Sequence, residues 1–420
     1  MRRLGGLRHT SPGRLRLIRA ALVVLTLLTG LFAGVTAANS RAGTDDLRDR
    51  AQPLLVDAET VLSALADADT TAAQAFLAGG LEPAGLTQLY EQDLTRASVA
   101  LTAAARRTPE NGVAGDAVRQ LAEGIQQYAS LVASARANNR QGLPVGASYL
   151  STASQLNRLK LQPLAKTLLS AAQAEVDSGY SAARSTGWTS VLMLLLIALT
   201  VAFVAAQIYL SRATRRTFNL PLLAATVVTL ALGLTVLAIV TAQRSHLNTA
   251  DEAGSKPVTL LAQARTLALN ERSFESLTLV ARAGEDANED DFKRAAQQLN
   301  TQFGVLSRAL RGTDAAGPVR SAAQQHQTYL SNHDKVRAAD KNGDYAGAVR
   351  LAVASGTTAN FTALTDNLAT ALEDRKDVFA HESSVAGRGL GALTVLGPLL
   401  ALAVCALAVV GLRARLEEYR

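Results

Sequence analysis

The chain has 420 residues, of which 48% are hydrophobic and only 4% aromatic, and its formal net charge is +7. Such a low aromatic content argues against a β-sandwich, whereas the prevalent Ala, Leu, Gln, Glu and Arg are good helix formers. The single cysteine, Cys405, excludes an internal disulfide and a cysteine-based zinc site. The composition therefore predicts an all-α protein with membrane spans.

Four apolar stretches are long enough to cross the hydrocarbon core as helices. They cover residues 17–38, 188–210, 220–242 and 390–412, and none of them contains Asp, Glu or Lys. Arg19 lies near an edge, where its side chain can reach water. The first stretch could instead be a cleaved signal peptide, because small residues near its end suit cleavage. Its length favours an uncleaved anchor, and so does the recurrence of its Val35-Thr36-Ala37 at the end of the third stretch as Val240-Thr241-Ala242.

The short flanks of the spans predict their orientation. Arginines cluster in residues 1–16, in the loop 211–219 and in the tail 413–420. Positively charged flanks stay in the cytoplasm, and four crossings place all three on the same side. We therefore expect a multi-pass protein of the plasma membrane with both termini cytoplasmic. Because these flanks account for the positive net charge, the charge does not indicate nucleic-acid binding.

The two segments between spans, residues 39–187 and 243–389, align with each other. At one offset of 201 residues and without a gap, residues of the first segment recur in the second: Val118-Arg119, Gln126, Tyr128, Arg136-Ala137, Gly142, Gly146-Ala147 and Ser154 become Val319-Arg320, Gln327, Tyr329, Arg337-Ala338, Gly343, Gly347-Ala348 and Ser355. This pattern predicts an internal duplication. The alternative is two unrelated helical domains of similar length.

Turn residues divide each outer segment into about four stretches with helical periodicity. The breaks fall at residues 79–80, 108–112, 142–144, 284–291, 312–318 and 341–344. We therefore expect two tandem extracytoplasmic four-helix bundles, each with its first and last helices running into spans. Such a bundle can pass a small piston or tilt movement into the membrane.

The turn at residues 338–348 reads Ala-Ala-Asp-Lys-Asn-Gly-Asp-Tyr-Ala-Gly-Ala. It resembles the Gly-Asp-Tyr-type turn, followed by small residues, of the four-helix-bundle sensory domain of bacterial chemoreceptors and sensor kinases. The resemblance implies a sensory bundle in each outer segment. Asp340, Asn342 and Asp344 also have the spacing of a calcium loop. That loop requires a glycine and a glutamate where the chain has Tyr345 and Leu351, so a helix turn is favoured.

Candidate ligand or partner contacts are Tyr128 and Arg136, with their equivalents Tyr329 and Arg337. Arginine binds carboxylates with two parallel hydrogen bonds, so these pairs could line a site. The alternative is bundle packing with a surface arginine. The acidic cluster within residues 285–291 could bind a cation, but a solvated loop and helix start is favoured.

Two Gly-x-x-x-Gly pairs predict helix-packing faces in the membrane, since small residues allow helices to approach closely. The first pair is Gly30 and Gly34, and the second is Gly387 and Gly391. The histidines show no metal-chelating spacing, and no cofactor or metal is expected. No span holds a buried acid, and no nucleophile elbow, phosphate loop or kinase signature occurs, so we expect neither a transporter nor an enzyme.

The expected cytoplasmic portions are short, at 16, 9 and 8 residues. They are too small for a catalytic domain, so a signal would have to be handed to another protein. Four spans, tandem outer helical domains and short basic tips resemble the GlnX-type membrane signalling proteins of actinobacteria. The Ala- and Arg-rich composition suits a high-GC actinobacterium.

This resemblance implies two protein partners and a pathway. They are an extracytoplasmic glutamine-binding-type lipoprotein and the serine/threonine kinase known as protein kinase G, contacted by Arg212, Arg215 and Arg216. The chain would relay glutamate or aspartate availability to nitrogen metabolism. Membrane lipids and a second copy of the chain are further expected partners, and nucleic acid is not. The alternatives are a stand-alone small-molecule sensor and a structural envelope protein.

Overall fold

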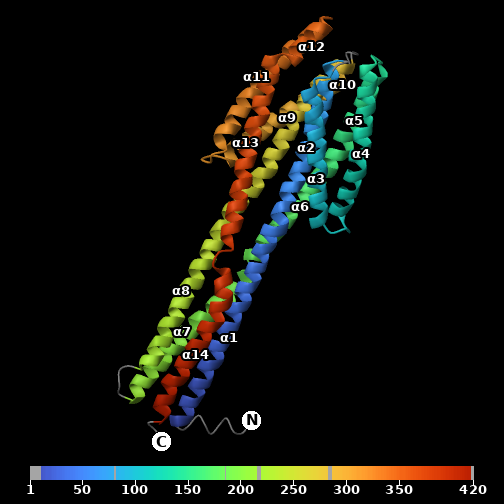
Figure 1. Cartoon of the computed structure of the whole chain (residues 1–420). Coiled ribbons are helices and arrows are strands. Elements are labelled where there is room, and N and C mark those ends of the chain that lie inside the picture. Colours follow the sequence, from blue (N-terminus) through green and yellow to red (C-terminus); the bar gives the residue numbers. More distant parts are fainter. Residues whose placement is uncertain (1–10, 80–81, 185, 215–218, 282–285, 418–420) are drawn as a thin grey trace. The chain divides into compact units, whose positions relative to one another are not determined.

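A computed structural model describes residues 11–79, 82–184, 186–214, 219–281 and 286–417 (Figure 1). Within these ranges all regular structure is helical, which confirms the predicted all-α class. Four helical runs are long and apolar enough to cross a membrane, as expected: Arg16–Leu77, Val145–Arg212, Leu220–Ala281 and Ser355–Arg413. The described residues form two compact units.

The first unit, here called the membrane unit, comprises the described parts of Met1–Leu47, Ser178–Leu247 and Ser383–Arg420. Its spans belong to α1 (Ser11–Asp46), α7 (Thr186–Thr214), α8 (Leu220–Thr249) and α14 (Leu390–Glu417). One apolar cluster joins Leu22, Leu210, Leu222 and Leu412, and another joins Ala37, Leu192, Val236 and Leu393. The starts of α1 and α8 therefore lie at the same end as the ends of α7 and α14. Arg16, Arg212 and Arg413 lie near this end.

The second unit, here called the outer unit, comprises the described parts of Arg48–Asp177 and Asn248–Glu382. Both outer segments are thus gathered in one compact unit. The first supplies α2 (Gln52–Leu77), α3 (Ala84–Arg107), α4 (Val113–Arg140), α5 (Val145–Leu156) and α6 (Gln162–Arg184). The second supplies α9 (Lys256–Ala281), α10 (Asp286–Ala309), α11 (Ala316–Lys341), α12 (Tyr345–Val353) and α13 (Ser355–Ala386).

The turn between α11 and α12 is a helix end followed by a helix cap. Gly343 has a φ of 81°, which suits a residue without a Cβ. The Asp344 carboxylate then accepts a hydrogen bond of 2.8 Å from the backbone N–H of Gly347. Asp340 is paired with Arg337. These two acids therefore stabilise helix ends, in line with the helix-turn interpretation.

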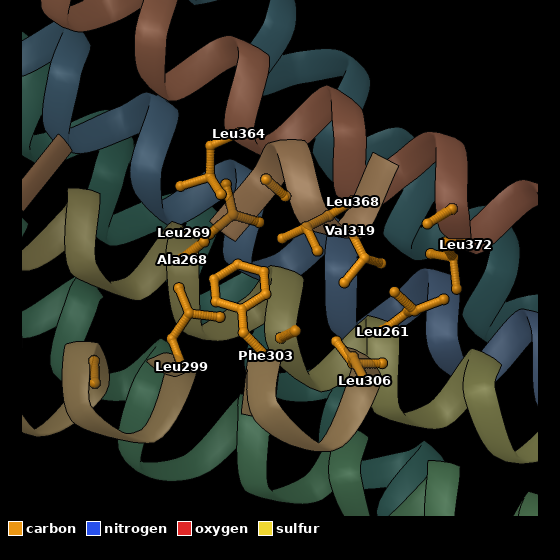
Figure 2. Packing of buried hydrophobic residues seen from close by; sticks show 14 of the residues in the cluster. Leu261, Ala268, Leu269, Leu299, Phe303, Leu306, Val319, Leu364, Leu368 and Leu372 are labelled. Atoms are coloured by element: carbon orange, nitrogen blue, oxygen red, sulfur yellow. The ribbon is translucent and has the colours of Figure 1, made fainter. Parts of the chain in front are cut away.

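Helices α2 and α9 are the most deeply buried elements of the outer unit. All residues from 61 to 70 and from 271 to 280 are buried. Apolar side chains of α9, α10, α11 and α13 pack together on one side (Figure 2), including Leu261, Ala268, Leu269, Leu299, Phe303, Leu306, Val319, Leu364, Leu368 and Leu372. Helices buried on every side must pair all the charges that they carry.

Three π-helical turns occur within the long helical runs, and each ends two residues before a proline. They are Leu47–Ala51, Asn157–Leu161 and Ala250–Ser255, followed by Pro53, Pro163 and Pro257. Proline lacks an N–H and its ring clashes with the carbonyl four residues earlier. The wider π turn relieves this clash without ending the helix. Helix α1 therefore continues into α2, and α8 into α9, as uninterrupted helical runs of 62 residues each.

The π turn before α9 is tied to α13. Pro257 leaves the carbonyl of Ala253 without its usual helical donor, and Arg375 Nη1 donates to that oxygen at 3.2 Å. Close packing accompanies this bond. A Cβ on Gly254 would lie 2.9 Å from the Cα of Phe379. A glycine is therefore needed where the two helices touch.

Candidate functional site

The buried charges of α2 and α9 form the most conspicuous polar feature of the outer unit. Asp67 of α2 accepts two hydrogen bonds of 2.9 Å each from the guanidinium of Arg265 on α9. Arg96 of α3 donates to the same carboxylate at 2.7 Å and to Asp93 at 2.7 Å. Burial, and then the proximity of Asp67, raise the pKa of Asp93 to about 7. The carboxylates of Asp67 and Asp93 thus both contact the guanidinium of Arg96.

Asp69 of α2 joins both outer segments in a second cluster. Its carboxylate accepts from Ser154 at 2.6 Å and from Ser273 at 2.7 Å. Tyr128 donates to it at 3.5 Å. Arg158 lies over the ring of Phe274 at 4.3 Å from the centroid, so the same region also holds a cation–π contact. Side chains of both outer segments therefore contact the carboxylate of Asp69.

Glu275 of α9 is the centre of a third, fully buried cluster. It accepts from Arg272 at 2.5 Å, from the Tyr329 hydroxyl at 3.1 Å and from His333 Nδ1 at 2.9 Å. Burial by itself would raise the pKa of Glu275. Arg272, His333 and Tyr329 outweigh that effect and lower it below its ordinary value. The carboxylate is therefore held ionised in the interior.

His333 connects this cluster to α10. Its Nε2 lies 3.2 Å from Glu289, and Arg337 lies 2.9 Å from the same carboxylate. Burial disfavours the charged imidazole, but Glu275 and Glu289 raise the pKa of His333 to about 9. The hydrogen bond from His333 lowers the pKa of Glu289 to about 2. At neutral pH the structure thus favours an imidazolium between two carboxylates.

One turn away along α9, Glu271 pairs with His326 of α11 at 3.0 Å. Both side chains are fully buried, and burial raises the pKa of Glu271 although His326 opposes this shift. In the described part of the chain, no group of His, Cys, Asp and Glu side chains is arranged to hold a metal ion.

The structure places the predicted pairs in equivalent environments. Tyr128 and Tyr329 are fully buried, and each donates to an acid on the first helix of its own segment, as described above. Arg136 donates to Glu82 at 2.7 Å, as Arg337 pairs with Glu289. Arg337 is itself buried. Each of the four has a partner inside the chain.

The acidic cluster was expected to be a solvated loop and helix start, and Glu289 departs from this expectation. Its side chain is only 7% exposed and it contacts His333 and Arg337. Asp291 pairs with Arg294, and Asp290 is exposed. Residues 282–285 lie outside the described residues. One acid of this cluster, Glu289, is therefore part of the interior of the outer unit.

The four glycines of the two Gly-x-x-x-Gly pairs lie where α1 approaches α14 and the turn before it. A Cβ on Gly30 would meet Ala401, and one on Gly34 would lie 3.3 Å from Pro398. A Cβ on Gly387 would lie 3.4 Å from Thr44, and one on Gly391 would lie 3.2 Å from Arg41. Arg212 is exposed at the end of α7, whereas Arg215 and Arg216 lie outside the described residues.

Sequence reasoning missed four acids of these clusters: Asp67, Asp69, Glu271 and Glu275. Charged residues on a helix are ordinarily taken as its solvated face. A signal was nevertheless present, because His326, Tyr329 and His333 recur at helical spacing on one face of α11. A face of polar aromatic and imidazole groups indicates polar partners on the opposing helix.

Comparison with known proteins gives one similarity. Residues 43–181 match the family model described as actinobacterial sensor domain. No curated protein and no solved structure matches the chain. The matched part covers the first outer segment, from the last residues of α1 to the end region of α6. This similarity fits a sensory membrane protein of actinobacteria and suggests a role in sensing rather than catalysis.

Proposed function

We propose that the protein is a transmembrane sensor in which α2 and α9 carry a signal from the outer unit into the spans. The observation that carries this proposal is the bidentate contact between Asp67 and Arg265. It ties together two helices that are each continuous with a candidate span. A partner or ligand that displaces one central helix would displace the other. The sensor-domain match over residues 43–181 supports a sensory role for this region.

In its specific form, the proposal assigns the signal to amino-acid supply. An extracytoplasmic solute-binding lipoprotein loaded with glutamate or aspartate would engage the outer unit. The flanks at the arginine-bearing end of the membrane unit would face the cytoplasm and contact a serine/threonine kinase. The exposure of Arg212 and the resemblance in topology support this assignment. Arg215 and Arg216 extend the same positive loop.

Affinity purification from gently solubilised native membranes, followed by mass spectrometry, tests the relay. We expect a solute-binding lipoprotein and a soluble kinase to co-purify, with recovery that depends on added glutamate or aspartate. Reversing the charges of Arg212, Arg215 and Arg216 to Glu should remove the kinase and retain the lipoprotein. Reversing the exposed Arg320 of α11 serves as the control and should retain both. Unchanged kinase-pathway output in the triple variant, with correct insertion, contradicts the relay.

A further inference from the structure

A groove of about 730 Å³ lies in the outer unit between α6, α9 and α10. Its size falls in the range of small-molecule sites. Each helix contributes one face at helical spacing, and the residues that matter here are Lys166, Leu169, Gln263, Leu267, Gln297 and Gln298. The first outer segment supplies one wall and the second supplies two. The groove therefore exists only because both segments share one unit.

Hydrogen bonds between α6 and α9 fix the spacing of two walls of the groove. Gln162 of α6 and Asn270 of α9 exchange two hydrogen bonds of 3.0 Å each. Eleven residues later on α6, Gln173 accepts from Thr259 of α9 at 3.2 Å. These bridges show that α6 and α9 run antiparallel, and the groove opens between them. A site fixed in this way needs little rearrangement to bind a ligand.

Lys166 is the one charged residue in the lining of the groove. No carboxylate in the described part of the chain lies within ion-pair distance of its ammonium group, whereas Lys376 elsewhere in the outer unit binds Glu59 at 2.7 Å. Lys166 is an exposed residue at the edge of the groove, and desolvation of its ammonium group by the neighbouring side chains lowers its pKa. An anion bound in the groove would give the ammonium group an ionic partner and would offset the free-energy cost of its desolvation.

The remaining lining combines amides with a small apolar area. The amides of Gln263, Gln297 and Gln298 form no hydrogen bond with other described residues, so each can both donate and accept. Leu169 and Leu267 provide apolar surface. Among the described lining residues there is no acid that could pair with a ligand ammonium group. A free amino acid would therefore leave its positive charge unpaired.

We propose that this groove binds a small organic monoanion, a carboxylate that also carries an amide and a short apolar part. Its carboxylate would pair with Lys166, its amide with the glutamines, and its apolar part with Leu169 and Leu267. The inference extends the proposed sensing role of the outer unit by giving it a direct ligand. It depends on neither the lipoprotein nor the kinase.

Calorimetry on the purified full-length protein in detergent tests the proposal with three matched probes. N-acetyl-L-leucine has the carboxylate, the amide and the apolar part. L-leucine restores the ammonium group, and N-acetyl-L-leucinamide lacks the carboxylate. We expect N-acetyl-L-leucine to bind at least about 10-fold more tightly than either comparator, as for a charged hydrogen bond lost from a site. Absence of N-acetyl-L-leucine binding, or equal binding of the three, overturns the proposal.

Variants assign the binding to the groove. Lys166→Gln should weaken N-acetyl-L-leucine binding by about 10- to 100-fold, whereas Lys160→Gln, at an exposed position in the π turn before α6, should leave it unchanged. Gln298→Glu adds the absent carboxylate and should shift the preference toward L-leucine. Equal binding in wild type and Lys166→Gln overturns the proposal. Absence of a co-purifying kinase from the wild-type protein, with intact N-acetyl-L-leucine binding, would refute the relay alone.

Discussion

Arg265 on α9 holds Asp67 on α2 through two hydrogen bonds of 2.9 Å, although the two residues are far apart in the chain. The side chains are 15% and 12% exposed, so the pair is largely withdrawn from water. Removing one member leaves the other charge without full compensation. This contact joins the two outer segments directly.

The first prediction concerns this pair. Arg265→Met should lower the free energy of unfolding of the outer unit by about 3 kcal/mol, because it leaves a largely buried carboxylate. Arg96→Met removes a more exposed cation and should cost no more than about 1 kcal/mol. Denaturant unfolding followed by circular dichroism measures both. If the Asp67→Leu/Arg265→Leu double variant is no more stable than Arg265→Met, the unpaired charge is not the cause.

The second prediction is a pH dependence centred on His333. Its pKa is raised from 6.5 to about 9 by Glu275 and Glu289, with Arg272 and Arg337 as the nearby cations. A raised folded-state pKa contributes stability that is fully present below 6.5 and is lost as the pH rises through 9. In His333→Gln the free energy of unfolding should therefore fall less at alkaline pH, by up to about 3 kcal/mol compared with wild type.

Thermal unfolding between pH 6 and 10 measures this alkaline limb. His381→Gln, at an exposed position of α13, is the control and should behave like wild type. The acid limb has the opposite sign. Because the pKa of Glu289 is lowered from 4.5 to about 2, its contribution is present above 4.5 and is lost as the pH falls through 2. An unchanged alkaline limb in His333→Gln would refute the assignment.

The third prediction concerns the π turn before α9. Pro257→Ala restores an N–H donor and relieves the clash with the Ala253 carbonyl, so regular α-helix should extend through residues 250–255. We expect slower amide hydrogen exchange in that segment and a weaker signalling output. Pro163→Ala removes the proline that follows the π turn Asn157–Leu161 and is the matched control for signalling. Equal effects of both variants would show that the position of the turn is unimportant.

The fourth prediction uses two helical glycines with opposite surroundings. A Cβ on Gly254 would press on the Phe379 backbone, so Gly254→Ala should cost about 1–3 kcal/mol. A Cβ on Gly304 in α10 would meet nothing within 4 Å, so Gly304→Ala should stabilise by about 0.5–1 kcal/mol. Unfolding of the two variants under identical conditions measures the contrast. Destabilisation by Gly304→Ala would mean that the helix needs that glycine for another reason.

Much of the helical layout could be predicted from the sequence because it depends on local chemistry. Apolar length identifies the four candidate spans, and turn residues mark helix ends such as the one at Gly343. The π turns were accessible too, since each precedes a proline, but periodicity alone does not distinguish a π turn from α-helix. Tandem duplication of the bundles stays a prediction.

The interior contacts were less predictable because they join residues distant in the chain. Tyr128 and Tyr329 were singled out from their equivalent positions, but the acids that they contact were not. Whether Asp67 faces water or Arg265 depends on which helices pack together. The spacing of residues along a helix predicts which face is buried, but it does not predict which other helix packs against that face.

The contact between α2 and α9 has a consequence for any fragment cut from the chain. A piece limited to residues 43–181 would keep the region that matches the sensor-domain model and lose Arg265 and Ser273. The side of α2 that α9 covers would then be open, with Asp67 and Asp69 on it. A second copy of the fragment could occupy that side, so a dimer of isolated pieces would report on the missing half of the chain rather than on the native protein.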